Sequence, residues 1–157
     1  MAGIEMEEYK ASEAAAWLEH VAGLKRRAAV ARESVEQARA LMLPQGIAYD
    51  GGGGGGCYAD AIPDGVARVQ ELVARYAEEV AVLVDEEARA ADAVSRMPTE
   101  LYRDVLRMHY LCGMPWADVA EACGYCLRSV MEFRRAALAE LWPLVPLGWR
   151  APMQPAL

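Results

Sequence analysis

Six consecutive glycines, Gly51 to Gly56, separate two long stretches in which small or apolar residues recur at alternating steps of three and four. Such spacing lines these residues along one side of an α-helix and is typical of a coiled-coil seam. The first seam comprises Ala14, Trp17, Val21, Leu24, Ala28, Ala31, Val35, Ala38 and Met42, and the second comprises Val66, Val69, Val73, Tyr76, Val80, Leu83, Ala90, Val94 and Met97. The pattern predicts helices over 12–42 and 64–97. Ordinary amphipathic helices packed on their own chain fit it as well.

The segment 43–63 between these helices lacks apolar periodicity, and its glycines disfavour regular structure on entropic grounds. We predict a flexible loop there, and a frayed polar segment at residues 1–12. Two heptad helices joined by such a loop most simply form an antiparallel hairpin, within one chain or across a dimer. A phosphate-binding loop would need Gly-Lys-Ser/Thr after a strand, which this segment lacks. The expected fold class is all-α, with residues 1–97 as a long, coiled-coil-like hairpin arm.

The segment 98–142 has the spacing of a helix-turn-helix, which we expect to form a separate C-terminal domain. Pro115 fits the first position of a short helix, and Gly124 fits the left-handed turn beyond its end. Val119 and Ala120 can pack inward from that helix. The following helix has an amphipathic pattern, with an apolar face at Val130, Phe133, Ala137, Leu138 and Leu141.

The segments on either side support this prediction. A helix over 101–111, ended by Gly113, would support the helix-turn-helix. The tail at 143–157 is rich in proline, which excludes a continuing helix. Through Trp142 and Trp149 the tail packs onto the globule or docks a partner, and the sequence does not choose between the two.

The exposed face of the second helix is the candidate DNA-binding site. At 100° per residue, five residues lie opposite or beside the apolar face: Arg128, Ser129, Met131, Glu132 and Arg135. In a helix-turn-helix this face enters the major groove. Arginine suits guanine edges and phosphates. We expect Arg134 to border the apolar side, and Trp116 to pack against the supporting helix.

These residues resemble region four of sigma-70-type transcription factors. The whole chain resembles small phage and prophage proteins of Gram-positive bacteria, in which a long helical arm precedes that module. The matching residues are Val105, Leu106, Tyr110, Gly113, Trp116, Val119, Ala120, Gly124, Tyr125, Leu127, Arg128, Val130, Ala137 and Leu138. The resemblance implies a regulator of late phage genes. The chain departs from the family at the cap of the second helix, where Cys126 replaces the usual serine and accepts hydrogen bonds less well.

Charge limits what the chain can bind by itself. The net charge is −7, and residues 43–97, with 10 acidic against 4 basic groups, supply −6 of it. Phosphate contacts through Lys and Arg dominate DNA affinity, so the isolated protein should bind double-stranded DNA weakly. A partner, such as RNA polymerase or a second copy, would supply the rest. The acidic outer face of the second helix is solvated surface or a docking site for a basic protein.

Other classes of site find less support. His109-x-x-Cys112 and Cys123-x-x-Cys126 have the pair spacing of a zinc site, but a helix-turn-helix needs no metal and we expect no metal or other cofactor. We see no secretory signal and no run of 18 apolar residues. The protein is therefore expected in the bacterial cytoplasm, with its four cysteines reduced. Neither His20 nor His109 has an evident nucleophile as partner, so we expect no enzyme.

The sequence thus predicts a sigma-factor-like transcription regulator that binds promoter DNA and engages RNA polymerase or itself through the arm. Two alternatives stay open. Small terminase subunits, which package DNA, also combine a helix-turn-helix with helical oligomerisation segments. A coiled-coil adaptor without DNA binding is the other.

Overall fold

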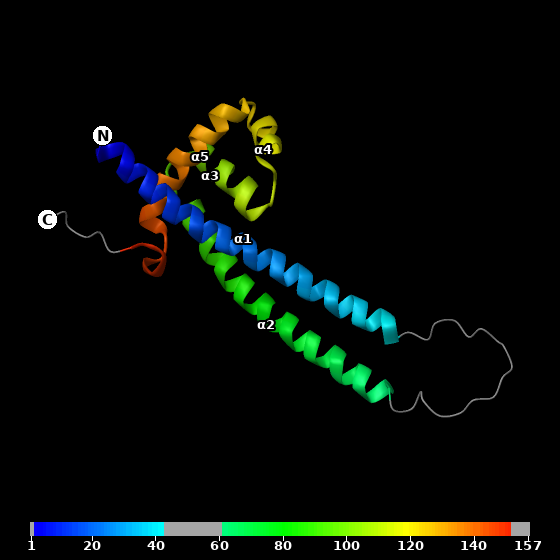
Figure 1. The fold of residues 1–157 in the computed structure, drawn as a ribbon. Helices are drawn as coiled ribbons and strands as arrows, with labels where there is room; N and C mark the ends of the chain where they lie inside the picture. The colour runs from blue at the N-terminus through cyan, green and yellow to red at the C-terminus, as the bar shows by residue number, and fades with distance from the viewer. Residues whose placement is uncertain (1, 43–60, 152–157) are drawn as a thin grey trace, which may run out of the picture. The chain divides into compact units, whose positions relative to one another are not determined.

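The structure, a computed structural model, describes residues 2–42 and 61–151, and within these ranges it is helical without any strand (Figure 1). The predicted all-α class is confirmed. The predicted loop at 43–63, with its glycines, lies almost entirely outside the described residues. The elements are the helices α1 (Ala2–Met42), α2 (Ala61–Ser95), α3 (Glu100–Leu106), α4 (Trp116–Cys123) and α5 (Leu127–Leu141), the π-helical turn η1 (Arg107–Leu111), and the 3₁₀ turns η2 (Trp142–Leu144) and η3 (Leu147–Trp149).

The first helix begins earlier than predicted. α1 starts at Ala2, so the prediction of a frayed segment is wrong for residues 2–12, which are helical. Tertiary contacts hold this polar segment: Ala11 is buried, and the Lys10 ammonium lies 5.1 Å from the centre of the Trp142 ring. A cation over an indole face is attracted by the ring's quadrupole. Similarly, α2 begins at Ala61, before the predicted start.

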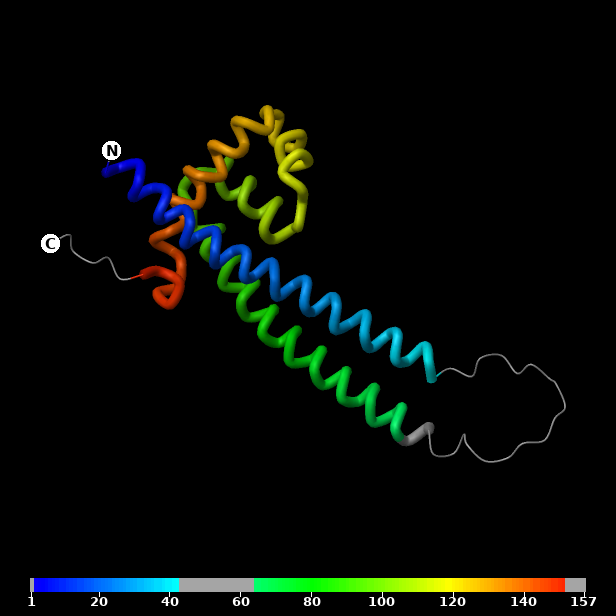
Figure 2. Tube along the Cα trace, in the orientation of Figure 1, coloured from blue at the N-terminus to red at the C-terminus, as the bar shows by residue number. Residues whose placement is uncertain are grey.

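The chain divides into two compact units. One unit holds residues 24–83, and the other holds residues 1–23 and 84–157. We call residues 1–23 and 84–157 the larger unit, and residues 24–83 the paired segment. In the paired segment, α1 and α2 lie side by side and run in opposite directions (Figures 1 and 2). The Met42 side chain lies 3.7 Å from where a Cβ on Gly65 would stand, so these two residues are level with each other.

Within the paired segment, the predicted seam residues of α1 and α2 differ in how far they are buried. On α1, Leu24, Ala28 and Val35 are buried as expected, but the last predicted seam position, Met42, is wrong, because it remains 41% exposed. On α2, however, Val66 and Val73 remain 39% and 36% exposed. The predicted second seam is wrong at these two positions, because the apolar arc of α2 is wider than the side that α1 covers.

The core of the larger unit joins the start of α1 and the end of α2 to α5 and the tail. Its largest buried side chains include Trp17, Leu18, Met97 and Leu141. Fully burying one such side chain stabilises a fold by roughly 1.5–3 kcal/mol. Alanines lie between them, which allows the helix backbones to approach closely: Ala14, Ala90, Ala93 and Ala137 are all buried in this cluster.

The tail packs onto this core through short turns. Between Leu141 and residue 151, where the described chain ends, the only helical elements are two 3₁₀ turns, in agreement with the proline content. Val145 is buried, and the ring centroids of Trp149 and His20 lie 4.9 Å apart. The described part of the tail, up to residue 151, therefore packs onto its own chain.

Candidate nucleic-acid interface

A tight turn joins α4 to α5. Gly124 has a φ of +73°, in the left-handed region where a Cβ would be strained. The Tyr125 amide donates to the Ala120 carbonyl at 3.1 Å and the Gly124 amide to that of Glu121 at 3.2 Å. This bond pattern satisfies carbonyls left open at a helix end. The predicted stop at Gly124 is confirmed, and it fixes the direction in which α5 starts.

A second core cluster holds both helices against α3. Val105, Val119 and Val130 are fully buried and come from α3, α4 and α5 respectively. At the edge of this cluster, the rings of Tyr125 and Phe133 meet edge to face, with centroids 4.9 Å apart. Because these contacts come from three helices, α5 cannot rotate about its axis without breaking them.

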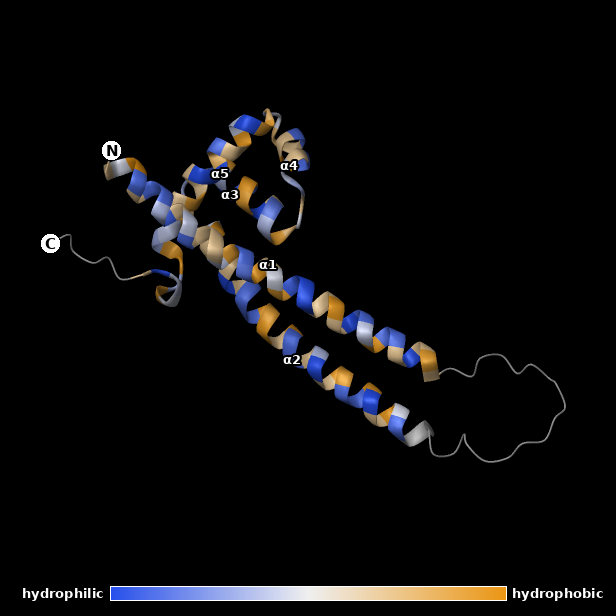
Figure 3. Cartoon of the chain, in the orientation of Figure 1, coloured by the Kyte–Doolittle hydropathy of each residue, from blue (hydrophilic) through white to orange (hydrophobic). Residues whose placement is uncertain are grey.

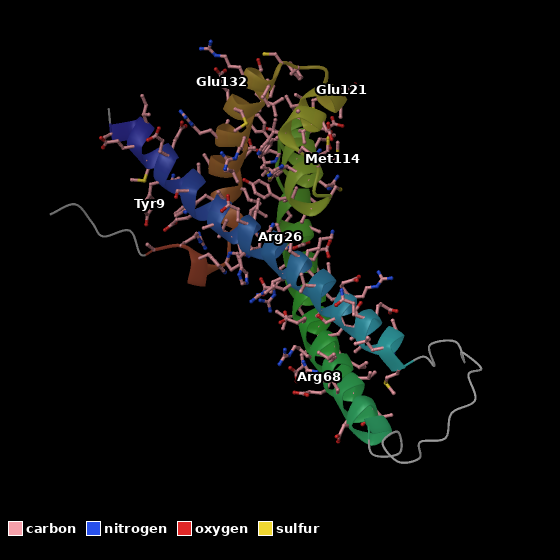
Figure 4. All side chains as sticks on the ribbon, turned by 45° about the vertical axis from the view of Figure 1, so that its right-hand side comes forward. Tyr9, Arg26, Arg68, Met114, Glu121 and Glu132 are labelled. Atoms are coloured by element: carbon pink, nitrogen blue, oxygen red, sulfur yellow. The ribbon has the colours of Figure 1, made fainter. Side chains whose placement is uncertain are left out.

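The rotation of α5 decides which residues face outward. Val130, Ala137, Leu138 and Leu141 are buried, as the apolar pattern predicts. All five residues of the predicted site lie on one helix: Arg128, Met131, Glu132 and Arg135 are exposed, and Ser129 is half-buried. In the view of Figure 4, Glu132 of α5 and Glu121 of α4 lie on opposite sides of this part of the molecule. Four of these residues, with Leu127, line a shallow hollow of about 600 Å³.

Each arginine of this face has a carboxylate nearby. Arg128 Nε lies 3.7 Å from Glu132 Oε1, one turn along α5. Arg135 Nη1 lies 3.8 Å from Glu8 Oε1 on α1, so the structure adds an acidic residue that the sequence did not place near this face. Exposed ion pairs of this kind contribute only about 0–1 kcal/mol, so the arginines can exchange these carboxylates for another anion.

Arg134 turns away from the exposed face, as predicted. Its Nε donates a hydrogen bond to the Tyr110 hydroxyl at 3.3 Å, and its guanidinium lies 5.6 Å from the centre of the Trp116 ring. Trp116 in turn stacks on His109 of η1 with ring centroids 3.8 Å apart, so it does pack against the segment preceding α4. Arg134 and Tyr110 are hydrogen-bonded to each other, so this aromatic cluster is structural.

His109 is held by a backbone carbonyl. Its Nδ1 lies 2.8 Å from the Met114 oxygen, which can only accept, so Nδ1 carries the proton. Burial lowers the pKa of His109, and the neighbouring Arg134 acts in the same direction, against the hydrogen bond to Met114. A neutral imidazole is therefore favoured in the fold.

The described cysteines, Cys112, Cys123 and Cys126, are free thiols, and Cys57 lies outside the described residues. Among residues 2–42 and 61–151, no three His, Cys, Asp or Glu side chains gather as a metal site would require. Cys126 immediately precedes α5, and its sulfur lies 3.2 Å from the Ser129 hydroxyl. The hydrogen bond with Ser129 is the main cause that lowers the pKa of Cys126, whereas burial raises the pKa of Cys123.

No helix in the described part of the chain is long and apolar enough to cross a membrane. The chain matches no protein-family model, no curated protein and no solved structure at a significant level of similarity. The case for a function therefore rests on residues and geometry.

Proposed function

We propose that this chain is a phage or prophage transcription regulator resembling sigma region four, whose α4, turn and α5 form a helix-turn-helix on promoter DNA. In this proposal α1 and α2 form an antiparallel arm that engages RNA polymerase or a second copy of the chain. The observation that carries the proposal is the outer face of α5, where Arg128 and Arg135 are exposed while the opposite face is buried. A helix fixed in this way can present the same side chains to a groove each time it docks.

The charges near this face bear on its affinity. Glu132 and Glu8 each lie near one arginine, so the local field is close to neutral. Binding to DNA replaces weak protein pairs by phosphate contacts, but carboxylates close to phosphates oppose it. We therefore infer weak binding by one copy alone, strengthened when a partner holds the chain at the promoter.

A second candidate function is favoured by the same pairs. If the arginines serve only to hold their carboxylates, the face has no net charge to attract DNA, and the chain is a coiled-coil adaptor. A DNA-packaging role has no specific observation in its favour. The mass of the protein in solution would test the packaging role, because rings of eight or more subunits would indicate packaging.

The test uses the full chain and a synthetic library of random-sequence duplexes at low salt. We expect the parent to enrich one sequence motif. Arg128→Ala should cost about 1–3 kcal/mol of specific affinity and relax the preference at one base position. Arg135→Ala should weaken binding to all sequences alike and lower the salt slope by roughly one.

Arg107→Ala is the matched control, because Arg107 is exposed but belongs to η1 and not to the face of α5. It should bind like the parent. If the parent enriches no motif, and the two α5 variants bind a fixed duplex no more weakly than Arg107→Ala, the DNA proposal is wrong and the adaptor is favoured.

A further inference from the structure

The paired segment leaves a row of apolar residues on α2 without a partner in the described chain. Half-buried residues toward α1 include Gly65, Val69, Leu72 and Tyr76. At 100° per residue, a second row begins roughly 100° further round the helix. We call it the valine stripe: Val66, Val73, Ala77 and Val80, of which only Val80 is half-buried. Hydrophobic residues along α2 are visible in Figure 3.

A basic row lies on the same face of the paired segment. Each residue of α1 is rotated by roughly 100° about the helix axis from the one before it. Measured in this direction from the centre of the α1 seam, Arg32 and Arg39 lie roughly 60–80° round the helix. When two right-handed helices run antiparallel, rotation in this direction from the seam of each helix leads to the same face of the pair. The valine stripe is displaced from the α2 seam in that direction too. Both arginines are exposed, so this face carries a basic row beside an apolar one.

An acidic row lies further round α2, beyond the stripe and on the side of the helix away from α1. Glu71 and Glu78 lie roughly 120–140° round α2 from Val66, and both are exposed. Glu71 is near Arg68 of its own helix, 3.4 Å away, but both side chains are 63% exposed, and such a pair holds weakly. From α1 across the stripe and round the outer side of α2, the order of the rows is therefore basic, apolar, acidic.

We propose that this face binds a second copy of the chain about a two-fold axis parallel to the helices. Such an axis, passing through the valine stripe, places stripe against stripe and reverses the order of the rows. The basic row of each copy then faces the acidic row of the other. A two-fold axis lying in the face across the helices would put basic on basic, so the charge order selects a parallel arrangement of the two α2 helices.

The register of the rows fits this arrangement. Because Met42 is level with Gly65, Arg39 is level with Arg68 and Arg32 with Arg75. Each arginine is thus three residues, roughly 4.5 Å along the axis, from a glutamate of the second copy, Glu71 or Glu78. That offset is within reach of long side chains and is the same for both pairs, since both rows have a spacing of seven.

The residues of the stripe suit a two-stranded contact. Val66, Val73 and Val80 recur every seven residues, the spacing of one position in a coiled-coil seam. Covering these side chains also removes apolar surface that α1 leaves in water. The inference deepens the proposed function by naming the partner of the arm. Its test measures mass and not DNA binding, so either can fail without the other.

The first experiment is sedimentation equilibrium of the full chain, with Val73→Glu as the test variant. The parent should be a dimer, and a glutamate inside the stripe should weaken dimerisation by roughly tenfold or more, since a buried carboxylate without a partner is costly. Val82→Glu is the matched control on the same helix, because Val82 is 50% exposed but lies on the charged side. It should dimerise like the parent. Circular dichroism should show equal helix content in all three chains.

The second experiment tests the two-fold charge order. Arg32→Glu with Arg39→Glu in one chain, and Glu71→Arg with Glu78→Arg in another, should each weaken the homodimer because like charges then meet. Mixed in equal amounts, these two double variants should form a heterodimer, since every acidic row again faces a basic one. A monomeric parent, equal dimerisation of the Val73 and Val82 variants, or a mixture that stays monomeric would each overturn the proposal.

Discussion

Arg135 of α5 lies 3.8 Å from Glu8 of α1, so the beginning of the chain contributes a carboxylate to the face proposed to bind DNA. Both side chains are more than half exposed, at 63% and 58%. The contact is therefore weak, and solvent and salt screen it. Its consequence is functional more than structural, because Glu8 competes with any phosphate for the same guanidinium.

Glu8→Gln should strengthen binding to a random-sequence duplex at low salt, by about the 0–1 kcal/mol that an exposed pair contributes. The gain should shrink as salt rises. Glu7→Gln is the control, since it removes the same charge from a neighbouring exposed residue. Equal gains from both variants in fluorescence anisotropy would show that only net charge matters and that the Glu8 contact does not.

The tail should be held by Glu13. Its carboxylate accepts from Trp142 Nε1 and from the Ala151 amide, both at 2.7 Å. Trp142→Phe keeps an aromatic ring but removes the donor, and should lower the free energy of unfolding by about 1–2 kcal/mol. Glu13→Gln should act through the same contact. The double variant should therefore lose less than the two single losses together in urea titrations, and full additivity would count against the contact.

Cys126 should be the more reactive of the two cysteines that flank the turn. The Ser129 hydroxyl foremost, with backbone amides at the start of α5, lowers the pKa of Cys126, and burial raises the pKa of Cys123. Near neutral pH more of Cys126 is thiolate, so iodoacetamide should label it first. Peptide mass spectrometry can follow both sites. Ser129→Ala should slow labelling of Cys126 and leave Cys123 unchanged; an unchanged rate at Cys126 would exclude Ser129 as the cause.

Stability should fall below neutral pH because of His109. Burial foremost holds the pKa of His109 below its ordinary value of 6.5 in the fold. The unfolded chain then takes up the proton first, so the contribution is complete above pH 6.5 and is lost as pH falls through the folded pKa. His109→Gln keeps a donor for Met114 but does not titrate, and its Tm should change less between pH 7 and 5.5. His20→Gln, which leaves His109 in place, should retain the parent's fall.

Much of the secondary structure follows from local pattern. The α1 seam from Ala14 to Met42 was predicted from spacing alone, since which residues share a side of a helix depends only on its 3.6-residue period. It is largely buried as far as Val35, whereas Met42 is exposed. The left-handed Gly124 and the two faces of α5 follow in the same way. A turn that needs a positive φ, and an amphipathic helix, can be recognised without knowing what lies opposite.

Only the tertiary structure decided which partners these elements meet. Residues 2–11 look polar and frayed in isolation, but they are helical in the fold, where Ala11 is buried and Lys10 lies over the ring of Trp142 from the other end of the chain. The exposure of Val66 and Val73 was equally hidden, because a hydrophobic pattern shows which side of α2 avoids water and not how many helices cover it. Local spacing fixes a helix and its faces, whereas contacts between residues distant in sequence depend on how the chain packs in three dimensions.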